Sequence, residues 1–140
     1  MALLWRSQFS VGNDLIDSDH QYLLEIINKA EVSLKAVNAA QLSGLLDELG
    51  KYARSHFERE ELLAKAVGYP KPKADQLHLS HNQLIDQMKT FRDGLGDSWT
   101  QESVTAFTTF LRDWLINHVI KEDMLMKPWL IKHSPRFDPR

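Results

Sequence analysis

The helical character of this chain is clearest around residues 52–61, which read Tyr52-Ala-Arg-Ser-His56-Phe-Glu-Arg-Glu60-Glu61. Apolar residues upstream follow the three-and-four spacing of a buried helix face: Leu42, Leu45, Leu46, Leu49, Tyr52 and Ala53. The same face continues through His56 and Glu60 before it returns to Leu63. Because burying an unpaired carboxylate is costly, we expect a compensating partner, and a metal ion is the first candidate.

Composition describes an ordinary soluble globular protein. The 140 residues are 43% hydrophobic and 26% charged, which predicts a single domain over residues 1–140. A net charge of -2 gives no basic surface for nucleic acid or anionic membranes. The absence of cysteine excludes disulfides and thiolate metal ligands. Without a signal sequence or a membrane-length apolar run, the chain is expected to be cytoplasmic and not membrane-inserted.

Helical periodicity recurs in three further segments. The pattern predicts an extended N-terminal arm over residues 1–17 and helices at about 18–38, 40–67, 74–95 and 99–127. Gly68-Tyr69-Pro70-Lys71-Pro72 separates the second helix from the third. Nothing resembles an alternating strand. Four amphipathic helices with short connections predict an all-α, antiparallel up-down-up-down bundle.

Polar residues lie on the predicted inner face of every helix. They are His20, His56, Glu60, His78, His81 and His118. In an antiparallel bundle the starts of the first and third helices meet the ends of the second and fourth, so all of these groups converge on one level. A lone inward histidine is more often a satisfied core residue, and an isolated His56/Glu60 pair is more often solvated. Convergence from four helices favours a metal site.

The residue types restrict the metal. Imidazole and carboxylate without thiolate suit iron, manganese or zinc, and redox or oxygen chemistry points to iron. Five histidines with two carboxylates exceed the four ligands of a structural zinc site and suit two octahedral ions.

The second carboxylate, Asp123, does not fit a regular helix. Five residues of ideal α-helix rotate by about 500°, which places Asp123 roughly 140° away from His118. Glu122, one turn after His118, is the more obvious inward acid. For Asp123 to reach the same site as His118, the last helix must either be distorted or end between them, and a π-type widening would help.

These motifs together resemble the hemerythrin family, in particular its bacterial single-domain members. The resemblance covers nearly the whole chain and rests on Ile16-Asp17-Ser-Asp-His20-Gln-Tyr-Leu23, His56-Phe57-Glu-Arg-Glu60-Glu61, Gly68-Tyr69-Pro70 and Trp114-Leu115-Ile-Asn-His118-Val-Ile-Lys-Glu-Asp123. The last run matches the family pattern W-L-x-x-H-x-x-x-x-D, including the five-residue step.

The third helix departs from the family pattern. The family has two histidines four residues apart, whereas His78 and His81 are three apart. If His81 takes the second place, the first falls on Leu77, which cannot bind a metal. His78 is then the alternative ligand, because residues three apart still share a helix face. Otherwise water or an exogenous anion completes the coordination of the ion bound by His81.

The resemblance implies a carboxylate-bridged pair of non-haem iron ions. Its ligands would be His20 and His56 on one ion, His78, His81 and His118 on the other, and Glu60 and Asp123 as bridges. The pocket around the iron ions would be lined by Phe57, Trp114 and Leu115. Ordinary core packing explains these three residues equally well.

The function implied is reversible dioxygen binding rather than enzymatic turnover. An open position on the ion held by His20 and His56 would take dioxygen. Storage, transport or delivery to an oxygen-consuming partner protein would follow. The alternatives are an oxygen or redox sensor module and a di-iron enzyme acting on peroxide or nitric oxide.

Overall fold

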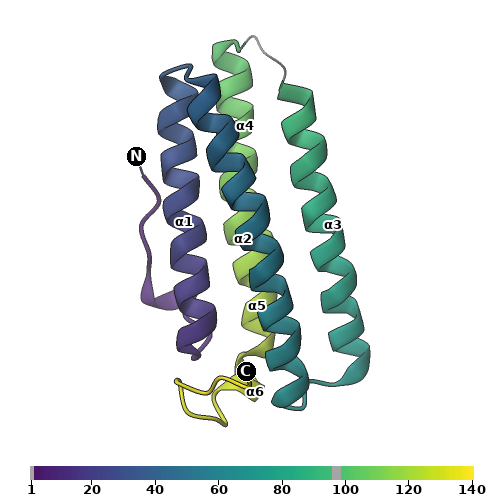
Figure 1. Cartoon of the computed structure of the whole chain (residues 1–140). Helices are drawn as coiled ribbons and strands as arrows, with labels where there is room; N and C mark the ends of the chain where they lie inside the picture. Colours follow the sequence, from purple (N-terminus) through teal and green to yellow (C-terminus); the bar gives the residue numbers. More distant parts are fainter. Residues whose placement is uncertain (1, 96–98) are drawn as a thin grey trace.

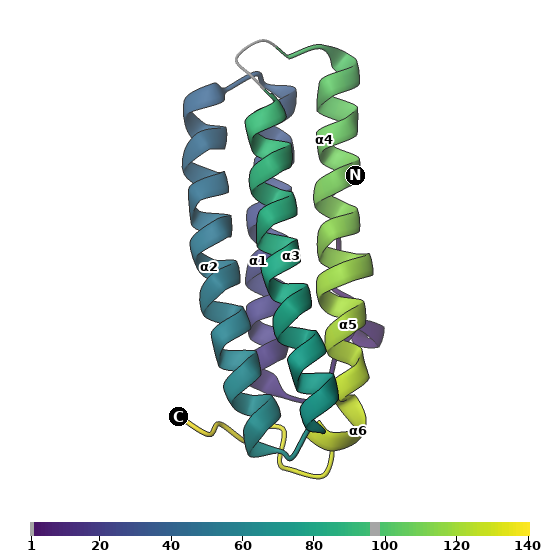
Figure 2. The same ribbon diagram turned by 90° about the vertical axis from the view of Figure 1, so that its right-hand side faces the viewer.

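The computed structural model describes residues 2–95 and 99–140 and contains no strand within them. Its elements are η1 (Ser7–Phe9), α1 (Asp14–Lys35), α2 (Ala39–Ala66), α3 (Lys71–Leu95), α4 (Gln101–Asp113), η2 (Trp114–Ile120), α5 (Lys121–Asp123), η3 (Met124–Met126) and α6 (Lys127–Leu130). The long helices lie side by side with alternating direction (Figures 1 and 2). The predicted all-α antiparallel four-helix bundle is therefore confirmed.

Two helices begin earlier than the sequence pattern predicts. α1 starts at Asp14 rather than near residue 18, because the side chain of Asn13 accepts a hydrogen bond from the Ile16 amide at 3.2 Å and caps the helix there. α3 starts at Lys71 rather than near residue 74. Proline is tolerated in the first helical turn, where no intrahelical donor is lost, so Pro72 does not delay this helix.

The fourth helix contains the predicted distortion. α4 passes at Trp114 into η2, a π-helix that continues through Ile120, and the chain then returns to α-helix in α5. A π-helix has more residues per turn than an α-helix, so it shifts the faces on which later side chains lie. Asp123 is buried at the end of α5, as the metal-site hypothesis requires.

The apolar core is divided in two by a polar layer. The larger cluster includes Leu23, Phe57, Leu84 and Ile120. The smaller cluster closes the end of the bundle and contains Val11, Ile16, Leu63, Ala64, Tyr69, Leu77, Met126 and Leu130. Each long helix passes from one cluster to the other, and His20, His56, Glu60, His81 and Asp123 lie at these crossings. The fold thus places buried polar side chains from every helix at one level.

The two ends of the chain are fastened to the bundle. The N-terminal arm runs along α1 (Figure 1), where Leu3 exchanges hydrogen bonds with the Asn28 side chain at 2.8 and 2.9 Å. The C-terminal segment crosses beneath the start of α1, and the Asp14 amide donates to the Pro135 carbonyl at 2.7 Å. This segment covers the end of the bundle nearest the polar layer.

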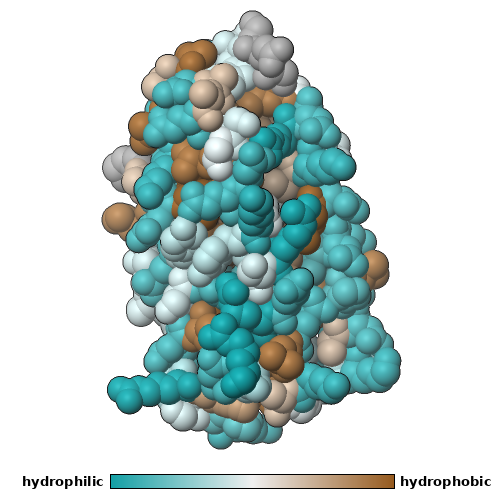
Figure 3. Space-filling view, viewed as in Figure 1, coloured by the Kyte–Doolittle hydropathy of each residue, from teal (hydrophilic) through white to brown (hydrophobic). Residues whose placement is uncertain are grey.

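The outer surface is mostly hydrophilic, with scattered apolar side chains on the face that Figure 3 shows. Within the described residues, no helix combines the length and the apolar character that crossing a membrane requires.

Candidate metal centre

Four buried side chains from three helices form the centre. His20 comes from α1, His56 and Glu60 from α2, and Asp123 from α5. One potential ligand atom from each lies within 4.8 Å of all the others. Oδ2 of Asp123 is 2.6 Å from Nε2 of His20 and 3.1 Å from Nε2 of His56. Two imidazoles and two carboxylates thus meet at one place in the bundle interior.

Several of these polar atoms have no partner of their own. Both carboxylate oxygens of Glu60, Nδ1 of His20 and Nε2 of His81 are buried without a hydrogen bond among the described residues. Nε2 of His56 lies 3.0 Å from Oε2 of Glu60 but makes its hydrogen bond to Asp123. Leaving buried acceptors unsatisfied costs about 1–3 kcal/mol each, and more when they are charged. The residues present therefore fit a bound cation.

The charge of the two carboxylates supports the same conclusion. Burial raises the pKa of Glu60, and the negative charge of Asp123 raises it further, to about 7. Burial also works against the charge of Asp123, but the neighbouring Glu60 carboxyl and the hydrogen bonds from His20 and His56 outweigh it and hold its pKa well below the usual range. Two carboxylates in contact cannot both be ionised cheaply without a positive charge, which a divalent ion would supply.

A second layer of residues holds His56 in place, and Asp19 is its central member. Oδ2 of Asp19 accepts a hydrogen bond from Nδ1 of His56 at 2.9 Å, and Oδ1 accepts one from the Tyr52 hydroxyl at 2.8 Å. Arg59 donates to both oxygens, at 3.0 and 2.8 Å. With Nδ1 held in this way, His56 turns Nε2 towards the centre, where it would bind a metal ion in the neutral form of the ring.

Asp19 is the site residue that the sequence analysis missed. Burial disfavours its charge, but bonds from His56 and Arg59 prevail and lower the pKa of Asp19 to about 2. Near a helix start, an aspartate is ordinarily explained by the helix dipole. The available signal was its position four residues before Leu23, which places it on the buried face of α1.

The histidines of α3 are placed differently from one another. His81 is buried, with Nε2 at 3.3 Å from Oε1 of Glu60 and Nδ1 at 3.1 Å from Glu61. His78 is 62% exposed and pairs with the other oxygen of Glu61. Three residues of α-helix turn by about 300°, so His78 is displaced from the inner face on which His81 lies. The structure does not bring His78 into the centre; buried Leu77 lies on that face.

His118 also lies outside the centre. Its side chain is 50% exposed, and Nε2 is 3.2 Å from Oδ2 of Asp113, five residues earlier. The π-helix η2 explains this contact, because its wider turn brings residues five apart onto one face.

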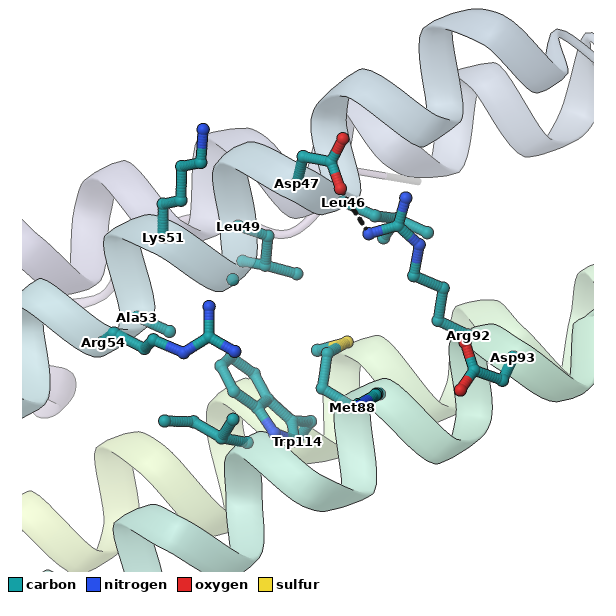
Figure 4. Close-up of a pocket in the computed structure, with 13 residues that line it drawn as sticks. Leu46, Asp47, Leu49, Lys51, Ala53, Arg54, Met88, Arg92, Asp93 and Trp114 are labelled. Carbon is teal, nitrogen blue, oxygen red and sulfur yellow. Dashed lines mark hydrogen bonds and ion pairs between the residues drawn. The ribbon is translucent and has the colours of Figure 1, made fainter.

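The three predicted wall residues are almost fully buried. Phe57 stacks on His81 with ring centroids 4.0 Å apart and an angle of 11°. The Trp114 indole donates to the Leu84 carbonyl at 2.9 Å, and Leu115 is inaccessible to solvent. Behind Trp114, a pocket of about 460 Å³ opens between α2 and α3, and Arg54 and Arg92 reach across it (Figure 4). This pocket is separate from the metal centre, whose side chains lie in the bundle interior.

An antiparallel helical bundle with converging buried imidazoles and carboxylates defines a class of cation-binding proteins. Comparison with known families places the chain within it: residues 11–130 match the family model described as the hemerythrin HHE cation binding domain. The chain belongs to the hemerythrin family.

Individual relatives agree with this membership. The chain is 31% identical over 137 residues to a bacteriohemerythrin of Methylococcus capsulatus, covering 93% of this chain and 98% of that protein. It is 29% identical over 138 residues to a bacteriohemerythrin of Stenotrophomonas maltophilia, covering 98% and 88%. Among solved structures, a hemerythrin point mutant superposes with a TM-score of 0.75 at 28% identity, covering 94% of this chain and 99% of that chain.

Proposed function

We propose that this protein reversibly binds dioxygen at a non-haem iron centre within the bundle. The observation that carries the proposal is the convergence of His20, His56, Glu60 and Asp123, where both Glu60 oxygens and Nδ1 of His20 have no hydrogen-bond partner among the described residues. Histidine and carboxylate without thiolate form a ligand set typical of non-haem iron. The names of the bacteriohemerythrin relatives support the same assignment.

The ligand roles follow from position. We infer that His20 and His56 would hold one ion and His81 the other, and that Glu60 and Asp123 would supply carboxylate ligands to both. His118 joins the second ion only after its ring turns away from Asp113. His78 stays outside this assignment because its ring faces solvent.

Surrounding residues orient the histidine ligands and keep the centre apolar, as binding of a small apolar ligand requires. Bound iron supplies the electrons that dioxygen binding needs. Asp19 orients the His56 ring through Nδ1, and Phe57 restrains His81 by stacking. Trp114 and Leu115 exclude water from the adjoining core, which limits proton access to the bound gas and favours its release unchanged. Storage, transport or delivery to an oxygen-consuming protein are the physiological roles that this chemistry serves.

Oxygen titration of anaerobically Fe(II)-loaded protein tests the proposal. The wild type should develop a visible ligand-to-iron charge-transfer band that saturates with dioxygen. His56→Ala should abolish the band, whereas His133→Ala should retain it because His133 is exposed in the C-terminal segment. An equal band in His56→Ala, or none in the wild type after iron loading, would refute the proposal.

A further inference from the structure

The Glu60 carboxylate faces two histidines on opposite sides. Oε2 lies 3.0 Å from Nε2 of His56, and Oε1 lies 3.3 Å from Nε2 of His81. Both oxygens and the His81 nitrogen are buried without a hydrogen-bond partner among the described residues. The unpaired atoms therefore mark a second ion position beside His81, in addition to the one beside His20 and His56.

Helix α3 contributes only one ligand to this second position. One turn before His81, the inner face carries Leu77, which is 3% exposed and has no ligand atom. His78 lies on the outer surface against Glu61. With one imidazole from α3, the second position needs a further protein ligand to hold an ion as firmly as the first.

Glu122 is an unassigned carboxylate next to Asp123 in the chain, and Glu61, the other unassigned carboxylate near His81, already pairs with Nδ1 of that histidine. It precedes Asp123 in α5, is half-buried, and accepts a hydrogen bond from the hydroxyl of Ser80, the residue before His81. Its carboxylate thus lies between α5 and α3, next in sequence to Asp123 and bonded to the residue before His81.

A surface pocket adjoins the missing ligand. Its volume is about 640 Å³, and Leu77, His118 and Glu122 line it together with Tyr69. The pocket gives the Glu122 and His118 side chains space to change rotamer without displacing the core. Leu77 marks the place in this wall that a second α3 ligand would occupy.

We propose that Glu122 is a ligand of the second metal ion, in place of the histidine that α3 lacks. This proposal rests on the proposed iron centre. The second position would then be richer in oxygen ligands than the first, with carboxylates from Glu60, Asp123 and Glu122 and an imidazole from His81. Such a set suits a hard first-row ion such as iron or manganese, and the two positions bind metal with unequal affinity.

Anaerobic Fe(II) titration by calorimetry separates the two positions. The wild type should show two binding events. Glu122→Gln should weaken the second event by about tenfold or more and leave the first unchanged, whereas Glu25→Gln, an exposed carboxylate on α1, should match the wild type. Leu77→His/Glu122→Gln returns a ligand to α3 and should recover the second event. Bound iron counted by elemental analysis gives an independent readout.

The outcomes distinguish this proposal from the one on which it rests. Two events of wild-type affinity in Glu122→Gln would overturn the role of Glu122 while leaving the iron centre intact. Absence of both events in the wild type would instead remove the iron centre itself. An unchanged first event in Glu122→Gln also shows that this variant is folded.

Discussion

Replacing Asp19 by asparagine tests how the second layer of residues, which holds His56 in place, affects metal binding at the centre. The carboxylate is 3% exposed and accepts hydrogen bonds from His56, Tyr52 and two nitrogens of Arg59. Asparagine keeps the size of the side chain but removes its charge and exchanges one acceptor oxygen for an NH₂ donor. At least one of the present donors must then face another donor.

The expected magnitudes follow from these contacts. Loss of an outer partner of a ligating histidine lowers metal affinity by about 10- to 100-fold, which corresponds to roughly 1.4–2.7 kcal/mol. In the metal-free protein, loss of charged hydrogen bonds to His56 and Arg59 should lower the free energy of unfolding by about 2–3 kcal/mol. Asp19→Asn should thus weaken both metal binding and the fold.

Iron titration and urea denaturation measure the two effects. Asp75→Asn is the matched control, because Asp75 is 66% exposed and pairs with exposed Lys71, an interaction worth about 0.5 kcal/mol or less. Wild-type affinity of Asp19→Asn for the first iron ion would refute the positioning of His56 by Asp19. A loss of stability no larger than that of Asp75→Asn would refute the energetic part.

Other predictions concern pH, metal removal and the end of α1. Burial and Asp123 raise the pKa of Glu60 from 4.5 to about 7, so between these two pH values the folded metal-free protein binds a proton that the unfolded chain has lost. Its free energy of unfolding should therefore fall as pH rises from 4.5 to about 7, and urea denaturation of Glu60→Gln should show a smaller fall. Free iron at a hundred times its Kd should stabilise the wild type by about 2.7 kcal/mol, so chelation should lower Tm by roughly 10 °C in calorimetry. Val37 has a φ of 51°, so Val37→Gly should stabilise the protein by about 1 kcal/mol, whereas Val32→Gly inside the helix should destabilise it, and equal effects would contradict this reasoning.

Periodicity was sufficient to predict the bundle and most of its polar layer. The inward positions of His20, His56, Glu60 and His81 follow directly from the spacing of apolar residues around them. The five-residue step from His118 to Asp123 also indicated a distorted last helix; η2 is such a distortion, but it does not bring His118 to the same site as Asp123. These features depend on local helical geometry, which a single sequence encodes well.

The direction in which an individual side chain points from its helix was harder to predict. His118 lies on the expected helix, but the π-helix turns its ring towards Asp113, and the location of a π-turn depends on tertiary packing. His78 is only three residues from His81, and that small angular difference was enough to expose it. Asp19 was overlooked because its role depends on Tyr52 and Arg59, which come from another helix.

The most direct test of the account is repeated oxygenation and deoxygenation of the iron-loaded wild type, monitored by visible absorption with iron counted per chain. The account predicts two iron ions per chain and a charge-transfer band that appears with dioxygen, disappears under vacuum or inert gas, and returns at the same intensity over several cycles. Iron well below two per chain in the fully loaded protein would contradict the pair of metal positions. A band that never appears, or that bleaches irreversibly in the first cycle, would contradict reversible dioxygen binding.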